Sequence, residues 1–342
     1  MTFRESLPVL PAETTPANGC PTAAGAASGD ALPAHPPGDR FGRDRAALRK
    51  PDFLKRPVGK GAAVVALKQR LRAAGLVTVC EEARCPNLDE CFKRGTATFL
   101  IMGKDCTRAC GFCAVGTARP APLAADEPQR VAEASRSLGL DHVVVTSVNR
   151  DDLPDGGAAH FRAVVDALRE ALPQGKIEVL TPDFCGDLDA VRRVAAGPLD
   201  VFNHNVETVS RLYSRVRPKA RYERSLDILR CVATEFPAVK VKSGLMVGLG
   251  ETREEVFALM ADLKAAGVQI VTIGQYLRPS LVQVPVAEYL TEPVYAAYRE
   301  HGQALGFEHV FAGAFVRSSY NAAEAFLHAQ QAVAGSTAGT PA

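Results

Sequence analysis

The stretch "TFLIMGKDCTRACGFC", Thr98 to Cys113, joins a short apolar run to three closely spaced cysteines. The run "TFLIM" is typical of a buried β-strand, and the thiols of Cys106, Cys110 and Cys113 follow it with the spacing C-x3-C-x2-C. A tetrahedral zinc site or a closed iron–sulfur site uses four protein ligands. A four-iron cluster held by three thiolates leaves one iron open, and that iron can bind a small chelating substrate. Three cysteines can therefore form a functional site.

Downstream of this stretch, short apolar runs alternate with longer amphipathic segments. The later apolar runs are "HVVVTSV", "KIEVLTP", "DVFNHNVE", "VKVKSGLMVGL" and "VQIVTIGQYL". The segments between and after them predict helices at roughly 127–138, 158–171, 187–195, 222–235, 252–266 and 292–304. In the fifth helix, Thr252 and Glu255 have the spacing of a capping box. Six strand–helix units predict an α/β fold with a parallel sheet, either partly closed into a barrel or open and doubly wound.

Polar residues gather where the predicted strands end, and ligands bind at this edge in both architectures. Besides the cysteine run, these residues are Thr146 and Ser147, Asn203 to Glu207, Gly248 to Glu251, and Gln275 to Arg278. Asn203, Asn205 and Glu207 alternate along a predicted strand and are expected to share one face. His204 then points the other way, and we interpret it as a core histidine with satisfied hydrogen bonds. The pattern predicts a single active site.

The composition is that of a globular protein with metal-binding thiols. In 342 residues, 40 Lys and Arg balance 38 Asp and Glu, which does not favour nucleic-acid binding. The sequence shows no apolar run of membrane-span length and no signal-peptide pattern, so we expect a cytoplasmic location without membrane association. Nine cysteines, six of them between Cys80 and Cys113, favour metal ligands over disulfides.

A second group of cysteines precedes the first strand. In "CEEARCPNLDEC", Cys80, Cys85 and Cys91 have the spacing C-x4-C-x5-C, which is looser than the C-x2-4-C pairs of zinc sites. The spacing favours a second iron–sulfur cluster over zinc.

The C-x3-C-x2-C run after a first strand, with Phe112 before its last cysteine, resembles the radical S-adenosylmethionine superfamily. The two cysteine groups together resemble the lipoyl synthase family, and the resemblance covers residues from about 49 to 321. The other motifs that carry it are "RKPDFLK", "TSVNRDDLPDGGAAHF", "FNHNVETVSRLYSRVRP", "SGLMVGLGET", "TIGQYLRPS" and "VRSSYNA". The resemblance implies a partial (βα)6 TIM-like barrel, with N- and C-terminal extensions that carry an auxiliary cluster.

The resemblance also implies the reaction and the partners. S-adenosylmethionine on the open iron would give a 5′-deoxyadenosyl radical, and two sulfur atoms would enter C6 and C8 of an octanoyl chain linked to a carrier lysine. The carrier would be a 2-oxoacid dehydrogenase E2 domain or the glycine cleavage H protein. Flavodoxin or ferredoxin would supply electrons. The auxiliary [4Fe-4S] cluster would supply the sulfur, and an iron–sulfur carrier would rebuild it.

The site residues implied by the resemblance fall into two sets. Cys106, Cys110 and Cys113 would hold the radical [4Fe-4S] cluster. Cys80, Cys85, Cys91 and Ser319 of the R-S-S-Y motif would hold the auxiliary cluster. S-adenosylmethionine would be bound by Phe112, Thr146 and Ser147 (methionine carboxylate), Asn203, Asn205 and Glu207 (ribose or amino group), Gly248 (adenine side) and Arg278.

The expected domain organisation follows these motifs. It consists of a disordered Ala/Pro-rich tail (1–40), a basic arm and auxiliary-cluster extension (41–95), the barrel (96–306), a C-terminal segment (307–330) and a disordered tail (331–342). The basic arm is either a solvated segment or a docking surface for an acidic partner.

Several alternatives stay open at this stage. Asn149 replaces an aspartate that the family usually has, and "GAFVRSSYNA" and "RPSLVQVPV" also depart from its pattern, which leaves room for a paralogue with a different octanoyl carrier. Another sulfur-inserting radical enzyme would place its second cluster differently. A non-enzymatic electron carrier would have complete cysteine ligation, and a zinc-stabilised nucleic-acid binder would be more basic.

Overall fold

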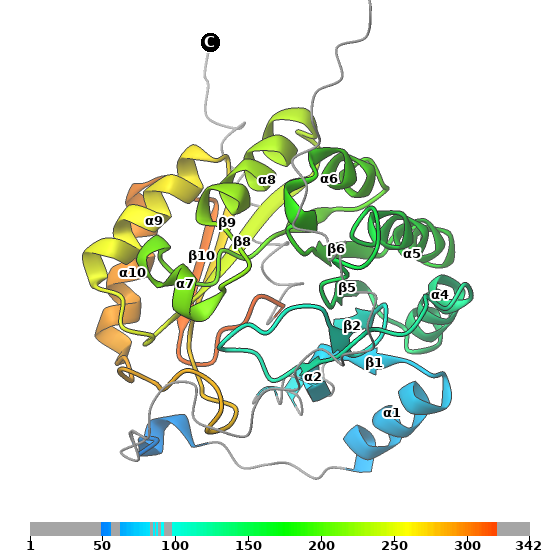
Figure 1. Ribbon diagram of the computed structural model, residues 1–342, viewed down its shortest axis with the longest axis horizontal. Helices are drawn as coiled ribbons and strands as arrows, with labels where there is room; N and C mark the ends of the chain where they lie inside the picture. Colours follow the sequence, from blue (N-terminus) through cyan, green and yellow to red (C-terminus); the bar gives the residue numbers. More distant parts are fainter. Residues whose placement is uncertain are drawn as a thin grey trace, which may run out of the picture.

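A computed structural model describes residues 49–55, 62–82, 85, 87, 90–91 and 98–319 (Figure 1). The two predicted disordered tails (1–40 and 331–342) lie outside these residues, as do most of the basic arm and Tyr320 of the R-S-S-Y motif. The predictions made for them are not tested by the structure.

The described residues contain one large sheet that does not close. Its strand order is β1-β2-β5-β6-β7-β8-β9-β10, and every neighbouring pair is parallel except β1 and β2. The strands are β1 (Val77–Thr78), β2 (Thr98–Ile101), β5 (His142–Ser147), β6 (Lys176–Leu180), β7 (Val201–Asn203), β8 (Lys240–Val247), β9 (Ile270–Gln275) and β10 (His309–Gly313). A small second sheet pairs β3 (Asp105–Cys106) with β4 (Gly116–Thr117), so it brackets the C-x3-C-x2-C run.

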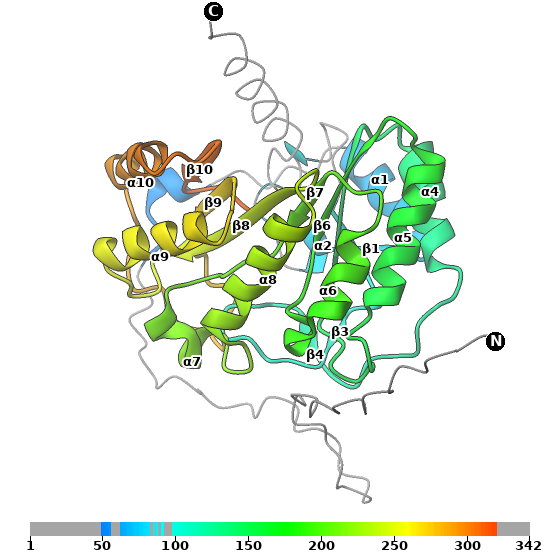
Figure 2. The same ribbon diagram turned by 90° about the horizontal axis from the view of Figure 1, so that it is seen from above.

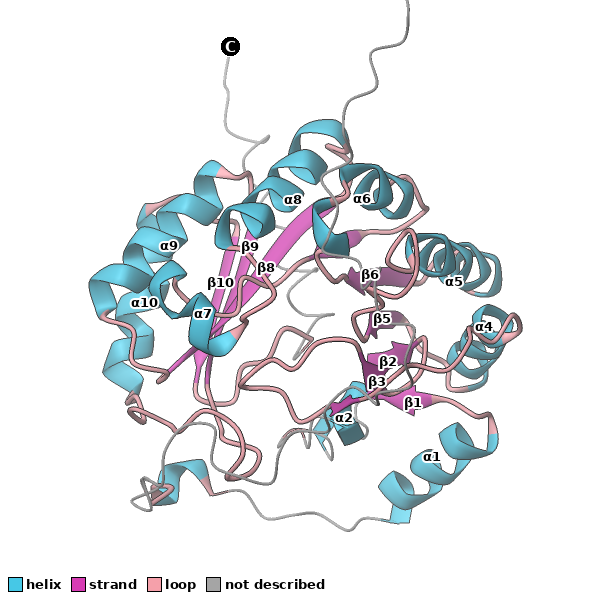
Figure 3. Ribbon diagram, in the orientation of Figure 1, coloured by secondary structure: helices cyan, strands magenta, loops and turns pink. Residues whose placement is uncertain are grey.

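Six helices cover the outer face of the sheet (Figures 1 and 3). They are α4 (Glu127–Ser137), α5 (Ala158–Ala171), α6 (Leu188–Ala195), α8 (Tyr222–Glu235), α9 (Arg253–Ala265) and α10 (Glu292–Ala304). Seen from above, α4, α5, α6 and α8 lie in a row along this face (Figure 2). In the large sheet, one of these helices lies between each pair of consecutive strands from β2 to β9, and α10 follows β9, so the predicted partial (βα)6 barrel is confirmed.

The remaining helical elements are short or lie in the N-terminal extension. They are η1 (Asp52–Leu54), α1 (Ala62–Ala73), α2 (Val79–Glu82), η2 (Phe184–Gly186), η3 (Ser210–Leu212) and α7 (Tyr213–Val216). None of the helices in the described part of the chain has the length and apolar character of a membrane span.

Helix α9 shows why the predicted helix boundaries agree with the structure. The Thr252 hydroxyl accepts a hydrogen bond from the Glu255 amide (3.2 Å), and the Glu255 carboxylate accepts one from the Thr252 amide (2.8 Å). This capping box satisfies two amides that the first turn leaves unpaired. Val256 and Met260 are fully buried on the inner face, and Gly267, with φ +82°, ends the segment in a left-handed conformation.

The strand predicted from "DVFNHNVE" is shorter than expected. Strand β7 ends at Asn203, and Glu207 has φ +66° and forms only an isolated bridge with Leu245. The regular strand is therefore shorter than predicted, but the predicted alternation holds. Asn203 contacts Glu178 and Asn205 contacts Glu207, while His204 between them bonds to Ser225 on the helix side of the sheet. Glu207, in the left-handed region, ends this alternation.

A buried polar cluster links four neighbouring strands. The ammonium of Lys242 on β8 lies 2.9 and 3.1 Å from the two carboxylate oxygens of Glu178 on β6, and both side chains are 1% exposed. The Asn203 amide donates a hydrogen bond to Glu178 (3.2 Å), and His142 Nε2 lies 3.6 Å from the same carboxylate. Although burial alone would raise it, the Lys242 charge holds the pKa of Glu178 at about 2. Asn203 thus belongs to the polar core of the barrel.

Candidate active site

A cavity of about 430 Å³ brings together segments that are far apart in the sequence. Its polar and sulfur-containing wall residues include Lys50, Cys80, Cys85, Asn87, Cys91, Cys113, Asn205, Glu207, Gln275, Arg278, Arg317, Ser318 and Ser319. All three cysteines of the second group (Cys80, Cys85 and Cys91), Cys113 of the first group and both serines of the R-S-S-Y motif therefore face the same space. Phe112 lines it too, whereas Cys106 and Cys110 lie in the same loop as Cys113 but not on the cavity wall.

The N-terminal extension and the C-terminal segment meet at this cavity. The Asn87 side-chain amide donates a hydrogen bond of 2.6 Å to the Phe315 carbonyl, 228 residues away in the sequence. The C-terminal segment also packs against the end of β9, since a Cβ on Gly274 would lie only 2.1 Å from the Val316 carbonyl oxygen. The cavity is thus bounded by both extensions of the barrel.

Lys50 is a cavity residue that the sequence analysis missed. Burial, and then the charge of Arg317, lower the pKa of its ammonium group. In the sequence, Lys50 lies in a basic segment with many other Lys and Arg residues, and no local pattern separates it from them. Only the resemblance of "RKPDFLK" to the family distinguished it.

The C-x3-C-x2-C loop is fixed from two sides. The Gly111 amide donates to the Val216 carbonyl (2.8 Å), and the Gly111 carbonyl accepts from the Val284 amide (2.8 Å). The Gln283 side-chain amide donates to the Cys113 carbonyl (3.0 Å). The segments after β7 and β9 therefore set the shape of this loop.

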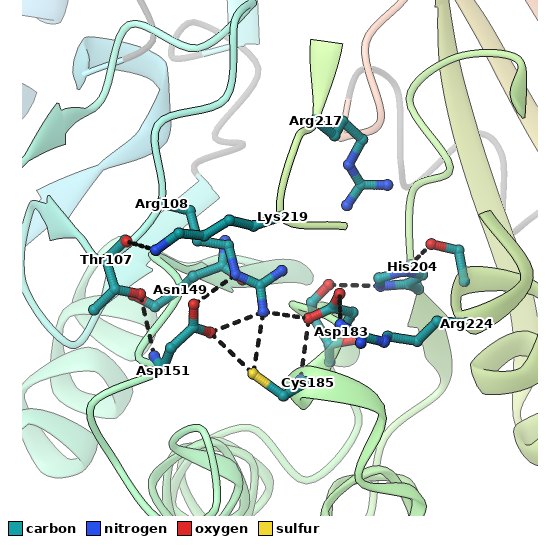
Figure 4. Close-up of polar contacts among 12 residues, drawn as sticks. Thr107, Arg108, Asn149, Asp151, Asp183, Cys185, His204, Arg217, Lys219 and Arg224 are labelled. Atoms are coloured by element: carbon teal, nitrogen blue, oxygen red, sulfur yellow. Dashed lines mark hydrogen bonds and ion pairs between the residues drawn. The ribbon is translucent and has the colours of Figure 1, made fainter. Parts of the chain in front are cut away.

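Arg108, between the first two cysteines of the loop, is the centre of a buried ion cluster (Figure 4). Its guanidinium donates two hydrogen bonds to Asp151 (2.7 and 2.8 Å) and one to Asp183 (2.6 Å), and Arg224 lies 3.1 Å from the other oxygen of Asp183. Burial alone would raise the pKa of Asp183, but Arg108 holds it well below its usual range. This cluster anchors the loop to the ends of β5 and β6.

The environment of the thiols fits cysteine-held clusters. Burial raises the pKa of Cys80 and Cys110 to about 11 and that of Cys113 to about 12, so these groups are protonated at neutral pH unless a metal replaces the proton. In the part of the chain that the structure describes, no three His, Cys, Asp or Glu side chains form the group that a single metal ion needs. Three thiols from one loop, beside an internal cavity, suit the donor set of a four-iron cluster.

Asn205 and Glu207 form the polar end of the cavity. The Asn205 amide nitrogen donates to the Glu207 carboxylate (3.1 Å) and to the Ser318 hydroxyl (2.6 Å). Its buried Oδ1 has no hydrogen-bond partner among the described residues. Burial raises the pKa of Glu207, while the nearby Arg217 charge opposes this shift. An unpaired buried acceptor beside a carboxylate suits a ligand with N–H or O–H donors.

Arg217 is a second residue that the sequence analysis did not single out. It is half-buried, and its guanidinium donates to the carbonyls of Asn205 (2.9 Å) and Val206 (3.2 Å). It also lies over the ring of Tyr213, 5.4 Å from its centroid. Its position before Pro218 in "SRVRP" gave no sign that it supports the turn that carries Asn205.

The other predicted ligand residues lie outside the cavity wall. The Thr146 hydroxyl donates to the Leu180 carbonyl (2.9 Å), and the buried Ser147 hydroxyl has no partner among the described residues. At Gly248, a Cβ would lie 2.2 Å from the Gln275 side chain, so the chain's own packing requires the glycine. The binding roles assigned to these residues stay predictions.

His204 agrees with its interpretation as a core residue. Its ring nitrogens pair with the Thr181 carbonyl and the Ser225 hydroxyl, both at 3.0 Å, and burial lowers its pKa to about 4. It is therefore neutral at physiological pH.

Comparisons with known proteins identify the family of this chain. Residues 100–263 match the model of the Radical SAM superfamily, which defines the class as radical S-adenosylmethionine enzymes. Residues 37–85 match the N-terminal domain of lipoyl synthase of the Radical SAM family. The chain belongs to the lipoyl synthase family, as its curated relatives show.

Three of these relatives match this chain over nearly the whole of their own length. The lipoyl synthase of Rubrobacter xylanophilus is 50% identical over 295 residues, which are 86% of this chain and 92% of that protein. Those of Caldanaerobacter subterraneus subsp. tengcongensis and Anaeromyxobacter sp. are 54% and 52% identical, with 80% and 83% of this chain and 96% and 97% of theirs covered. The crystal structure of methylornithine synthase (PylB) is only 15% identical, with a TM-score of 0.49 over 77% of this chain and 88% of that chain, and adds nothing to the assignment.

The predicted family, enzyme class and cofactors are therefore confirmed. The chain is a radical S-adenosylmethionine sulfurtransferase that uses [4Fe-4S] clusters and acts on octanoylated carrier proteins.

Proposed function

We propose that the cavity is the place where two sulfur atoms enter C6 and C8 of the carrier-bound octanoyl chain. The observation that carries this assignment is the meeting of both cysteine groups and the serine pair at one cavity. In this proposal the radical cluster is held by Cys106, Cys110 and Cys113, and the auxiliary cluster by Cys80, Cys85, Cys91 and Ser319.

The rest of the cavity suits an alkyl substrate. Its apolar wall residues include Val79, Leu180, Leu245, Met246, Leu277 and Val316. When bound, the clusters and S-adenosylmethionine supply radical hydrogen abstraction and sulfur. The chain itself supplies an apolar surface that orients eight carbons and excludes water.

We assign the S-adenosylmethionine contacts to the predicted residues that line the cavity. Asn205 offers its unpaired Oδ1 and Glu207 its carboxylate to the amino group or the ribose hydroxyls. Phe112 and Arg278 flank the same space. Asn203 is excluded from this set because its amide is committed to Glu178 in the barrel core.

The loop after β9 is where we expect the carrier domain to dock. Pro279 lines the cavity, while Leu281 and Val282, two and three residues further on, are 73% and 52% exposed. Two and three residues span at most about 7 and 11 Å, so this apolar pair lies near the cavity. The carrier is an E2 domain of a 2-oxoacid dehydrogenase or the glycine cleavage H protein, and both fit a cytoplasmic enzyme reduced by flavodoxin or ferredoxin. An iron–sulfur carrier rebuilds the consumed cluster.

Anaerobic reconstitution tests this function. The protein is mixed with S-adenosylmethionine, a reductant and an octanoyl-lysine peptide, and mass spectrometry follows thiolated peptide and 5′-deoxyadenosine. We expect a gain of two sulfurs, and loss of the auxiliary cluster's iron in Cys85→Ala and Ser319→Ala, with Ser318→Ala as the matched control that keeps this iron. 5′-Deoxyadenosine without thiolated peptide would keep the radical chemistry and contradict the substrate assignment.

A further inference from the structure

The sulfur of Cys106 lies among N–H donors. The backbone amides of Asn149 and Arg108 donate to its Sγ at 3.3 and 3.4 Å, and the Asn149 side-chain amide lies within bonding range at 3.9 Å. Two of these three donors come from one residue, Asn149, at the end of β5 rather than from the cysteine loop itself.

Residues of the cysteine loop hold Asn149 in place. Its carbonyl accepts hydrogen bonds from the amide and the hydroxyl of Thr107, at 3.2 and 3.0 Å, and the Thr107 hydroxyl accepts one from the Asp151 amide at 3.1 Å (Figure 4). The bidentate contact between Arg108 and Asp151 adds a second link between the two segments. These contacts therefore hold the donors of Asn149 toward Cys106.

We propose that Asn149 is a positioning residue that raises the reduction potential of the cluster held by Cys106, Cys110 and Cys113. The inference rests on the proposed function, because it needs a cluster on Cys106. Reduction adds negative charge that spreads to the thiolate sulfurs, and N–H donors stabilise that charge. The potentials of iron–sulfur clusters depend on such hydrogen bonds and on nearby charge. Asn149 thereby eases delivery of the electron that starts each radical event.

The experiment isolates this cluster in a Cys80→Ser/Cys85→Ser/Cys91→Ser background of the full chain. After anaerobic reconstitution, an EPR-monitored redox titration gives the midpoint potential of the remaining cluster. Asn149→Leu removes the side-chain donor without adding charge, and Asn149→Asp replaces it with a carboxylate. Asp152→Asn is the matched control. It also changes a charge near the loop, but the Asp152 carboxylate accepts its hydrogen bonds from Arg150.

Both Asn149 variants should become harder to reduce. At the wild-type midpoint, we expect the ratio of reduced to oxidised cluster to fall about tenfold or more in Asn149→Asp, equivalent to about 59 mV, and less in Asn149→Leu. Asp152→Asn should shift the midpoint less than either. A wild-type midpoint in Asn149→Leu overturns the inference.

Loading is checked before potentials are compared. Iron and sulfide contents identify a variant that fails to assemble its cluster, and Asn149→Ala then replaces Asn149→Leu. If the triple-serine background itself binds no iron, the proposed location of the radical cluster is wrong, and this inference falls with it. If it binds iron but the midpoints agree, only the role of Asn149 is refuted.

Discussion

Replacement of Arg108 by methionine should destabilise the protein and weaken the cysteine loop. The Arg108 side chain is 4% exposed, and its partners Asp183 and Asp151 are 0% and 18% exposed. Removal of one member of a buried ion pair costs about 3–5 kcal/mol, because the other charge stays buried without its partner. Asp183 keeps its contact with Arg224 at 3.1 Å, and Asp151 reaches solvent. We therefore expect Arg108→Met to lower the free energy of unfolding by about 3 kcal/mol, the lower end of this range.

The assay compares this variant with a matched one on the surface. Arg192 has a similar set of contacts, two hydrogen bonds to Glu235 and one to Asp189, all at 2.8 Å, but it is 41% exposed. Surface ion pairs contribute little, so Arg192→Met should leave the melting temperature nearly unchanged. For Arg108→Met we expect a fall of about 6 °C in the reconstituted protein.

Iron retention gives a second readout of the same reasoning. Arg108 ties the loop that carries Cys106 and Cys110 to the barrel, so Arg108→Met should also lower the iron bound after gel filtration. Equal melting temperatures for the Arg108→Met and Arg192→Met proteins would refute the claim that burial decides the strength of these contacts. A normal iron content would refute the anchoring role.

Three further predictions concern the core, the cavity loop and a helix end. The Glu178 pKa of about 2 is below its ordinary value of 4.5, so wild-type stability should fall as the pH drops through this range. In Lys242→Met burial should raise that pKa, and the stability measured by urea unfolding should instead fall as the pH rises from about 5 to 7. Leu281→Asp with Val282→Asp should lower kcat/KM about tenfold on the intact carrier, about 1.4 kcal/mol, and much less on the octanoyl-lysine peptide; equal losses would contradict docking there. Thr252→Ala should cost about 1 kcal/mol of unfolding free energy through loss of the α9 cap, and no change would show that the cap is dispensable.

Local sequence signals predicted the elements of the barrel well. The bounds of α5 (158–171), α8 (222–235) and α10 (292–304) agree with the expected ranges, because an apolar stripe and its end residues are properties of adjacent positions. The polar ends of the strands also predicted the position of the cavity, since parallel strands bring their carboxyl ends to one edge.

The details of the site needed information that adjacent positions do not hold. The early end of β7 at Asn203 and the left-handed backbone at Glu207 are local departures that a two-residue periodicity cannot reveal. Lys50 and Arg217 were missed because a basic residue in a polar segment has the same local pattern whether it faces solvent, lines a cavity or bonds to the backbone of another segment. The Asn87–Phe315 contact joins segments 228 residues apart, and no local rule predicts such a pairing.

That long-range contact also sets an order of events during synthesis. A ribosome adds about 5–20 residues per second, so Phe315 follows Asn87 by roughly 11–46 s. During this interval the thiols of Cys80, Cys85 and Cys91 have left the ribosome, while the segment with Ser319 that closes their side of the cavity does not yet exist. With the ligand set proposed above, the auxiliary centre can gain its serine ligand only after this interval, and until then the nascent chain presents three thiols without their fourth partner.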